Sequence, residues 1–206
     1  MILKPSKEAP LNAFILADII HGCGLPAGVF NLVSGHGREI GEVISSHPEV
    51  DMVSFTGSTS AGVSVSKAAS ETVKRVTLEL GGKSANIILD DADIAKASKM
   101  AVYSCFNNSG QECSSLSRLL VPASHRDEIV NIIASTMERY SVGDPMDEAI
   151  KCGPMVSESQ QKSVSEYISL GISEGATLIS GGEGLPDGIN TGSVSYTHLT
   201  LPTSPK

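Results

Sequence analysis

The chain has 206 residues and a formal net charge of −8, with 40% hydrophobic and 18% charged residues. This composition is that of an ordinary globular protein, long enough to bury a sizeable core. The acidic balance argues against nucleic-acid or anionic-membrane partners, because both attract basic patches.

Targeting signals and metal motifs are not visible in the sequence. No apolar run approaches the roughly 18 residues of a membrane span, and the start "MILKPSKEAP" has no apolar signal-peptide segment. The four cysteines form no CxxC pair, so neither a zinc site nor a disulfide framework is indicated. We therefore expect a cytoplasmic protein with reduced thiols and no metal centre.

Taken in chain order, hydrophobic alternation and helix breakers predict strands that alternate with helices. The expected strands cover residues 2–5, 28–35, 51–57, 75–82, 85–91, 117–122 and 176–180. The expected helices cover residues 11–21, 38–46, 60–70, 93–105, 124–140 and 159–175. Such alternation implies an α/β fold with a parallel sheet and crossover helices. The pair Gly81-Gly82 is the best candidate for a boundary between two α/β domains.

The two ends of the chain look unlike the middle. The first predicted strand has no sheet neighbour before it. At the other end, "VSYTHLTLPT" at residues 194–203 resembles the translation of a transposase-type sequencing adapter. We expect residues 193–206 to be a non-native tail, and the natural protein to be longer at both ends.

Two segments of the first half have features of nucleotide sites. "SGHGREIG" spaces Gly35, Gly37 and Gly41 one residue longer than the dinucleotide fingerprint, so by itself it indicates a plain strand-to-helix turn. In "FTGSTSAG" a strand ends at Gly57, and Ser58 begins the next helix. Helix N-termini bind phosphate, but serine there is equally typical of N-capping without a ligand.

Two further segments each contain a side chain suited to catalysis, Glu79 in the first and Cys113 in the second. "ELGGKS" is not a phosphate-binding P-loop, because Thr77 stands where that motif needs glycine. Glu79 is left as a carboxylate at the end of an apolar strand, a position suited to a general base or simply to solvent. Taken alone, neither this segment, nor the two before it, nor the one around Cys113 identifies a function.

The fourth segment, "FNNSGQECSSLSR", contains Cys113, and an isolated cysteine is more often a small buried side chain than a nucleophile. Gly110 lets the backbone approach a ligand, and Ser114 and Ser115 can begin a helix that favours the thiolate. No histidine lies nearby in the sequence, so a Cys-His protease is not supported.

The segments "KPSKEAPL", "FTGST", "LELGGKS" and "NSGQEC", in this order, resemble the aldehyde dehydrogenase superfamily. The resemblance extends over residues 2–190, and Cys113 lies 34 positions after Glu79 (113 − 79), as is usual in that family. It implies that residues 1–80 are the C-terminal half of a Rossmann-like coenzyme-binding domain. Residues 81–192 would be the N-terminal part of an α/β catalytic domain.

The resemblance also implies roles for particular residues. Cys113 would add to the aldehyde carbonyl, giving a thiohemiacetal and then a thioester, with its own backbone N–H at the oxyanion. Glu79 would activate the water that releases the carboxylic acid. The cofactor would be NAD⁺ or NADP⁺, with Ser58 at the pyrophosphate and Lys4 at the adenosine ribose. The further residues implied in the cofactor site are Lys7, Gly35, Phe55, Thr56, Gly57 and Leu80.

Some family features are missing from the sequence. Many members have an acidic residue at the position of Lys7, which disfavours the 2′-phosphate of NADP⁺. Lysine there makes NADP⁺ plausible, unless the adjacent Glu8 supplies the acidic group instead. The family's oxyanion asparagine, nicotinamide-ribose glutamate and oligomerisation strand would lie outside this chain. We therefore expect the chain as written to be inactive and poorly folded, and the full-length protein to be a homodimer or homotetramer acting on a small aldehyde.

Two alternatives remain open from the sequence. A CoA-acylating aldehyde dehydrogenase would transfer the acyl group to a thiol, although such enzymes generally lack the glutamate at Glu79. A non-catalytic homologue that kept the fold would need neither Glu79 nor Cys113.

Overall fold

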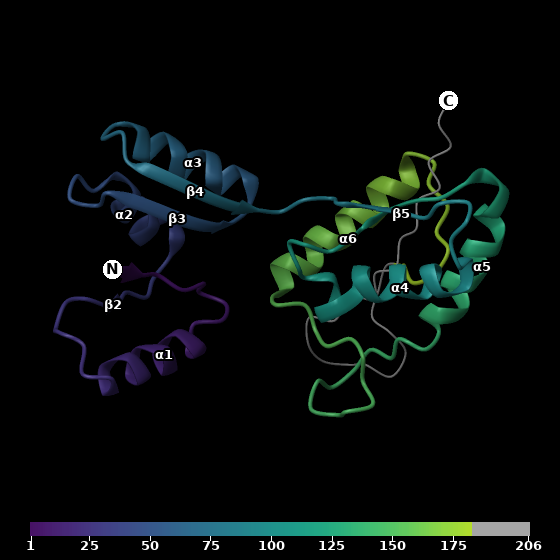
Figure 1. Cartoon of the computed structure of the whole chain (residues 1–206), viewed down its shortest axis with the longest axis horizontal. Coiled ribbons are helices and arrows are strands. Elements are labelled where there is room, and N and C mark those ends of the chain that lie inside the picture. The colour runs from purple at the N-terminus through teal and green to yellow at the C-terminus, as the bar shows by residue number, and fades with distance from the viewer. Residues whose placement is uncertain (183–206) are drawn as a thin grey trace. The chain divides into compact units, whose positions relative to one another are not determined.

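The structure is a computed structural model and describes residues 1–182 of the chain (Figure 1). The tail predicted at residues 193–206 lies outside the described residues. The chain divides into two units, the first from Met1 to Gly81 and the second from Gly82 onward.

The first unit contains two pairs of parallel strands and three α-helices. Its strands are β1 (Ile2–Leu3), β2 (Asn31–Leu32), β3 (Met52–Gly57) and β4 (Arg75–Leu80). Its helices are α1 (Leu11–Gly22), α2 (Glu42–Ser46) and α3 (Thr59–Ser70), and a π-helical turn over Gly37–Gly41 precedes α2. β1 pairs with β2, and β3 pairs with β4 along six residues. Helix α3 makes the crossover between β3 and β4, as parallel pairing requires.

Two predictions for this unit were too simple. The strand expected at residues 28–35 is limited to β2, because Gly28 has a φ of +86° and Gly35 a φ of +152°, neither of which continues a strand. The helix expected at residues 38–46 begins as the π-helical turn, with two backbone N–H groups sharing the His36 carbonyl. Only α2 is a regular helix there.

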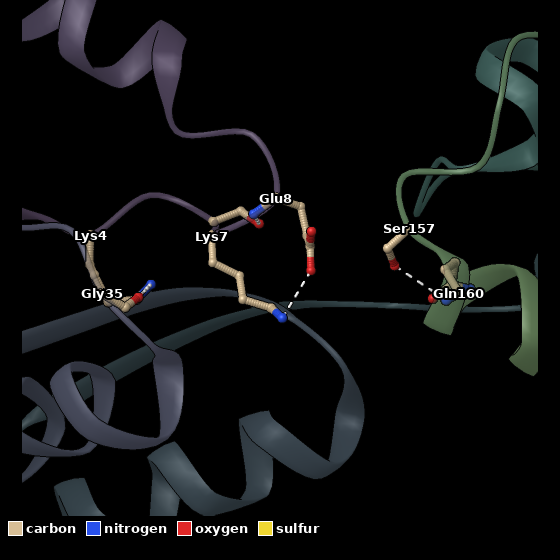
Figure 2. Close-up of polar contacts among 7 residues, drawn as sticks. Lys4, Lys7, Glu8, Gly35, Ser157 and Gln160 are labelled. Atoms are coloured by element: carbon tan, nitrogen blue, oxygen red, sulfur yellow. Dashed lines mark hydrogen bonds and ion pairs between the residues drawn. The ribbon is translucent and has the colours of Figure 1, made fainter. Parts of the chain in front are cut away.

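The second unit places helices beside one short parallel pair. Its strands are β5 (Ala85–Ile87) and β6 (Arg118–Leu120), which pair in register. Its helices are α4 (Ile94–Phe106), α5 (Arg126–Met137) and α6 (Glu158–Ser173), with a 3-10 turn over Ala123–His125 before α5. Asp93 caps α4 through its side chain, as the acidic segment before that helix predicts. Ser157 caps α6 by accepting the Gln160 N–H at 3.3 Å (Figure 2).

The hydrophobic core of the second unit lies where α4 and α5 pack together. On α5, Ile129, Ile133 and Met137 recur every four residues and therefore lie on one face of the helix. They meet Val102 of α4 and Ile88, which follows β5. All five side chains are buried, so this face of α5 holds the unit together.

Four expectations for the second unit need correction. Residues 176–180 form no strand: the Ala176 N–H bonds back to the Gly171 carbonyl at the end of α6, and no strand within residues 1–182 pairs with this segment. No helix begins at Ser114 or Ser115, where the chain makes a turn instead. The strand expected at residues 85–91 is limited to β5, and the helix expected at residues 124–140 is limited to α5.

None of the helices within residues 1–182 combines the length and the apolar character that crossing a membrane would require.

Candidate active site

The carboxyl ends of β3 and β4 bring several predicted site residues together. The register places Thr56 opposite Glu79 and Gly57 opposite Leu80. In parallel α/β sheets, ligands bind beyond the carboxyl ends of the strands. The Glu79 side chain is exposed at this edge, where a carboxylate can reach water or a ligand.

Two glycines allow close packing behind this edge. A methyl group added to Gly57 would lie 2.5 Å from Phe55 Cζ, and one added to Gly62 of α3 would lie 2.8 Å from Leu80 Cδ2. Phe55 and Leu80, both predicted at the cofactor site, thus pack against glycines of the same unit. Helix α3 can therefore approach β4 closely.

Ser58 is the N-cap of α3. Its Oγ accepts the Ala61 N–H at 3.3 Å and lies 3.1 Å from the Ser60 Oγ. The structure thus shows the capping role that the sequence left open. A phosphate contact at the same helix end stays a prediction.

Lys4 and Gly35 are brought together from positions 31 residues apart (Figure 2). The half-buried Lys4 Nζ donates to the Pro5 carbonyl at 2.7 Å and to the Gly35 carbonyl at 3.4 Å. A methyl group on Gly35 would lie 2.6 Å from Ile40 Cγ1, and the φ of +152° there favours glycine. The Lys4 ammonium is therefore fixed where the chain leaves β2.

Lys7 forms an ion pair with Glu8, with Nζ 3.1 Å from Oε1 (Figure 2). The two residues that bear on the choice between NAD⁺ and NADP⁺ therefore neutralise each other. Because the pair is solvent-exposed, its contribution to stability is about 0–1 kcal/mol. A bound phosphate could readily separate such a weak pair.

Residues 107–113, here the cysteine loop, contain a left-handed turn. Asn108, Ser109 and Gly110 have φ angles of +49°, +58° and +74°. The left-handed conformation costs a residue such as Ser109 roughly 1–2 kcal/mol, whereas Asn108 and Gly110 tolerate it. Such strain persists only where surrounding contacts fix it, and it is concentrated at functional sites.

Contacts to residues 153–156 fix the cysteine loop. The Ser109 Oγ donates to the Gly153 carbonyl at 3.0 Å. The Gln111 Oε1 accepts the Val156 N–H at 2.8 Å. Both bonds join positions more than 40 residues apart, so no local pattern in the sequence predicts them.

Cys113 lies on the turn that ends the cysteine loop, and its side chain is exposed. Its backbone N–H makes no hydrogen bond to any residue in the range 1–182. Just after the turn, the Leu116 N–H donates to the Ser104 carbonyl at 3.3 Å and ties the chain to α4. The thiol and the free N–H are thus both available to a ligand.

The other two cysteines of the second unit are inert by comparison. Cys152 is buried, and burial raises the pKa of its thiol. Burial likewise raises the pKa of the half-buried Cys105 thiol, against a smaller lowering by Lys83. The structure therefore agrees with the buried-thiol interpretation of Cys105. A protonated, buried thiol is a poor nucleophile.

Several polar side chains near Cys113 were not assigned a role from the sequence. They include Ser109 and Gln111, and also Asn107, whose Nδ2 donates to the Glu112 Oε1 at 2.7 Å. The Ser115 Oγ is buried and has no hydrogen-bond partner within the described part of the chain. The short motif around the cysteine was visible, but its distant partners were not.

Comparison with known proteins gives one family. The family model described as "Aldehyde dehydrogenase family" matches residues 1–200. A 3-succinoylsemialdehyde-pyridine dehydrogenase from a Pseudomonas species is 52% identical over 192 residues, which is 93% of this chain and 40% of that protein. The chain thus spans about 40% of the length of the curated relatives it matches.

Solved structures give the same result. A cysteine-to-alanine mutant of aldehyde dehydrogenase C from Pseudomonas syringae, in complex with NAD⁺ and octanal, matches with a TM-score of 0.93 and 46% identity, over 95% of this chain and 40% of that one. Betaine aldehyde dehydrogenase from Staphylococcus aureus in complex with NAD⁺ matches with a TM-score of 0.91 and 35% identity, over 95% of this chain and 39% of that one. The α/β fold expected from the sequence is confirmed.

Proposed function

The chain belongs to the aldehyde dehydrogenase family, and we propose that it is an internal part of an enzyme that oxidises an aldehyde to the carboxylic acid with NAD⁺ or NADP⁺. The activity is proposed for the full-length enzyme, meaning a protein of the relatives' length that carries residues 1–192 of this chain. The full-length enzyme can be produced from the complete reading frame, or by replacing the aligned segment of the Pseudomonas relative with residues 1–192 of this chain. We expect the 206-residue chain alone to produce no NADH or NADPH.

The observation that carries this proposal is the setting of Cys113. Its thiol is exposed on a strained loop held by distant residues, whereas in the same unit Cys105 is half-buried and Cys152 is buried. A cysteine that only fills space does not need a particular direction. A nucleophile does, because attack on a carbonyl demands a fixed position and direction.

In the proposed reaction, the Cys113 thiolate forms an S–C bond to the aldehyde carbonyl carbon, and the carbonyl π electrons move to the oxygen. The N–H of Cys113, which has no partner within residues 1–182, stabilises that oxyanion. When bound, the nicotinamide supplies an acceptor for the hydride that must leave this carbon. Loss of the hydride leaves an acyl group on sulfur as a thioester.

Glu79 is proposed as the base for the second half of the reaction. It takes a proton from water, the resulting hydroxide adds to the thioester carbonyl, and the C–S bond breaks to return the thiolate. The exposed position of Glu79 at the end of β4 supports this role. The balanced products are a carboxylic acid, the reduced cofactor and one proton.

The residues of the first unit fit a dinucleotide. The N-terminus of α3 offers a partial positive charge for a pyrophosphate, and Lys4 is a half-buried ammonium held at Gly35. In the proposed site, Ser58 would contact the pyrophosphate and Lys4 the ribose, with Thr56, Gly57 and Leu80 at the same strand edge. We keep both NAD⁺ and NADP⁺, because Lys7 and Glu8 neutralise each other.

Other properties of the full-length enzyme are part of the same proposal. We propose a homodimer or homotetramer that works in the cytoplasm. The octanal complex of the Pseudomonas syringae enzyme suggests medium-chain aldehydes for the first panel of substrates.

The test is formation of NADH or NADPH by the full-length enzyme with aldehydes of graded length. We expect Cys113→Ala to lower the activity by at least about 1,000-fold, because the nucleophile is removed. Cys23→Ala, which changes an exposed cysteine of the first unit, is the matched control and should leave the rate unchanged. Activity that survives Cys113→Ala would contradict the proposal.

Glu79→Gln separates the two halves of the reaction. We expect one equivalent of reduced cofactor to form rapidly and turnover then to stop, since the thioester is no longer hydrolysed. If turnover instead depends on added CoA in the unmodified enzyme, the acyl group goes to a thiol and the CoA-acylating alternative holds. If no aldehyde is oxidised, the non-catalytic alternative holds.

A further inference from the structure

Gln111 uses both ends of its side-chain amide to hold the cysteine loop. Its Oε1 accepts the Val156 N–H at 2.8 Å, and its Nε2 donates to the Asn108 carbonyl at 3.3 Å. A longer contact joins Nε2 to the Pro154 carbonyl at 3.5 Å. The half-buried side chain thus connects the left-handed turn on one side with residues 153–156 on the other.

The segment that Gln111 holds is itself anchored. Cys152 is buried, its N–H donates to the Ser141 carbonyl at 2.9 Å, and its carbonyl accepts the Gly143 N–H at 3.1 Å. These bonds fix the chain immediately before Gly153, which accepts the Ser109 hydroxyl. Residues 153–156 can therefore act as a rigid support.

We propose that Gln111 is a positioning residue for Cys113, whose side-chain amide clamps the left-handed turn of the cysteine loop onto residues 153–156. The inference rests on the proposed function, since it takes Cys113 as the nucleophile. Gln111 lies two positions before Cys113 and does not itself take part in the chemistry. It acts by holding a strained backbone that would otherwise relax and carry the thiol with it.

Two variants of the full-length enzyme test this role, and a third is the control. Gln111→Ala removes all three side-chain bonds, to Val156, Asn108 and Pro154. Gln111→Glu keeps an oxygen for the Val156 N–H but loses the donor to the Asn108 carbonyl. Gln160→Ala changes an exposed glutamine of α6 in the same unit and should have no effect.

The measurements separate positioning from a purely structural role. We expect Gln111→Ala to slow the first turnover of NADH or NADPH formation by about 10- to 100-fold, with the KM for aldehyde changed by less than about 3-fold. Gln111→Glu should fall between Gln111→Ala and the unmodified enzyme. The Val156 amide should exchange its hydrogen faster in Gln111→Ala than in Gln111→Glu, because only the first lacks an acceptor.

Each outcome decides. Slow first turnover at an unchanged thermal midpoint, with normal Gln160→Ala, supports the proposal. First-turnover rates within about 2-fold of the unmodified enzyme in both variants would overturn it. So would a loss of activity that accompanies general loss of amide protection in the second unit. If the unmodified enzyme oxidises no aldehyde, the proposed function fails. The clamp is then tested by the Val156 amide alone: faster hydrogen exchange in Gln111→Ala supports it, and unchanged exchange refutes it.

Discussion

Ser58, at the proposed phosphate site of the first unit, is held by a neighbour in the chain, whereas Cys113 lies on a loop that is held by residues far away. Ser58 is bonded to Ala61, three positions on. Gln111 is bonded to Val156, 45 positions on. The interiors of the two units also differ. The core cluster of large buried side chains around Ile129 lies in the second unit.

The difference shows what each proposed role requires. Binding a phosphate at a helix end needs only the first turn of a helix, which short-range bonds supply. Directing a thiol at a carbonyl needs a fixed backbone, which here depends on tertiary contacts. Changes to the interior of the second unit should therefore disturb Cys113, whereas local changes in the first unit should stay local.

The largest expected effect is that of Ile129→Ala. This side chain is 1% exposed, and its truncation should lower the free energy of unfolding of the second unit by about 2–5 kcal/mol. Urea denaturation of the full-length enzyme, followed by amide exchange in α4 and α5, measures it. The control is Ile19→Ala in α1, where the side chain is 60% exposed. Equal losses for the two variants would remove the contrast between the units.

Gly35→Ala should have the next largest effect. The new methyl group would lie 2.6 Å from Ile40 Cγ1 at a φ that favours glycine, with an expected cost of about 1–3 kcal/mol. Thermal denaturation measures the loss, which should be smaller in an Ile40→Ala background because the clash is removed. Gly37→Ala, with open space at its Cβ position, is the control. No loss in Gly35→Ala would show that this segment adjusts freely.

Ser58→Ala should cost about 1 kcal/mol, since it removes the N-cap of α3. The loss of amide protection should be confined to the first turn of α3, and the KM for the cofactor should rise because Ser58 is proposed at the pyrophosphate. Ser64→Ala, in the interior of the same helix, should change stability by less than about 0.5 kcal/mol. Slower turnover at saturating aldehyde and cofactor in Ser58→Ala would mean that the two units are more strongly coupled than we expect.

The smallest expected effect is on pH dependence. Burial raises the pKa of the Cys152 thiol above its ordinary value of 9.0. Above that pH the unfolded thiol loses its proton first, so the second unit should become less stable as pH rises from about 9 toward the folded pKa. Urea midpoints between about pH 7 and 10 should decline less steeply in Cys152→Ala than in the unmodified protein. An identical decline would show that this thiol contributes nothing to it.

The sequence predicts best those parts whose causes are local. The extents of α1, α3 and β4 follow from hydrophobic periodicity and breakers within about ten residues. The cap of α4 at Asp93 follows in the same way. The proposed roles of Glu79 and Cys113 came from the family resemblance, because neither residue has a distinctive local pattern.

The parts that were missed depend on distant partners. Residues 176–180 include the apolar pair Leu178-Ile179 and were expected to form a strand, but a strand also needs a partner, and none pairs with them within residues 1–182. The left-handed turn over residues 108–110 is stabilised by Gly153 and Val156, so the loop sequence alone does not specify it. Gly110 and Asn108 tolerate positive φ, but Ser109 shows no such preference.

The contacts that hold the cysteine loop also limit which changes of sequence residues 153–156 can accept during evolution. Both main contacts to residues 153–156 use main-chain atoms, the carbonyl of Gly153 and the N–H of Val156. Side chains in this segment can therefore be exchanged during evolution without loss of either bond. Deleting or inserting a single codon between positions 153 and 156 would change the spacing of these two atoms and break at least one bond. Homologous genes should accordingly vary in residue type here while keeping the segment's length.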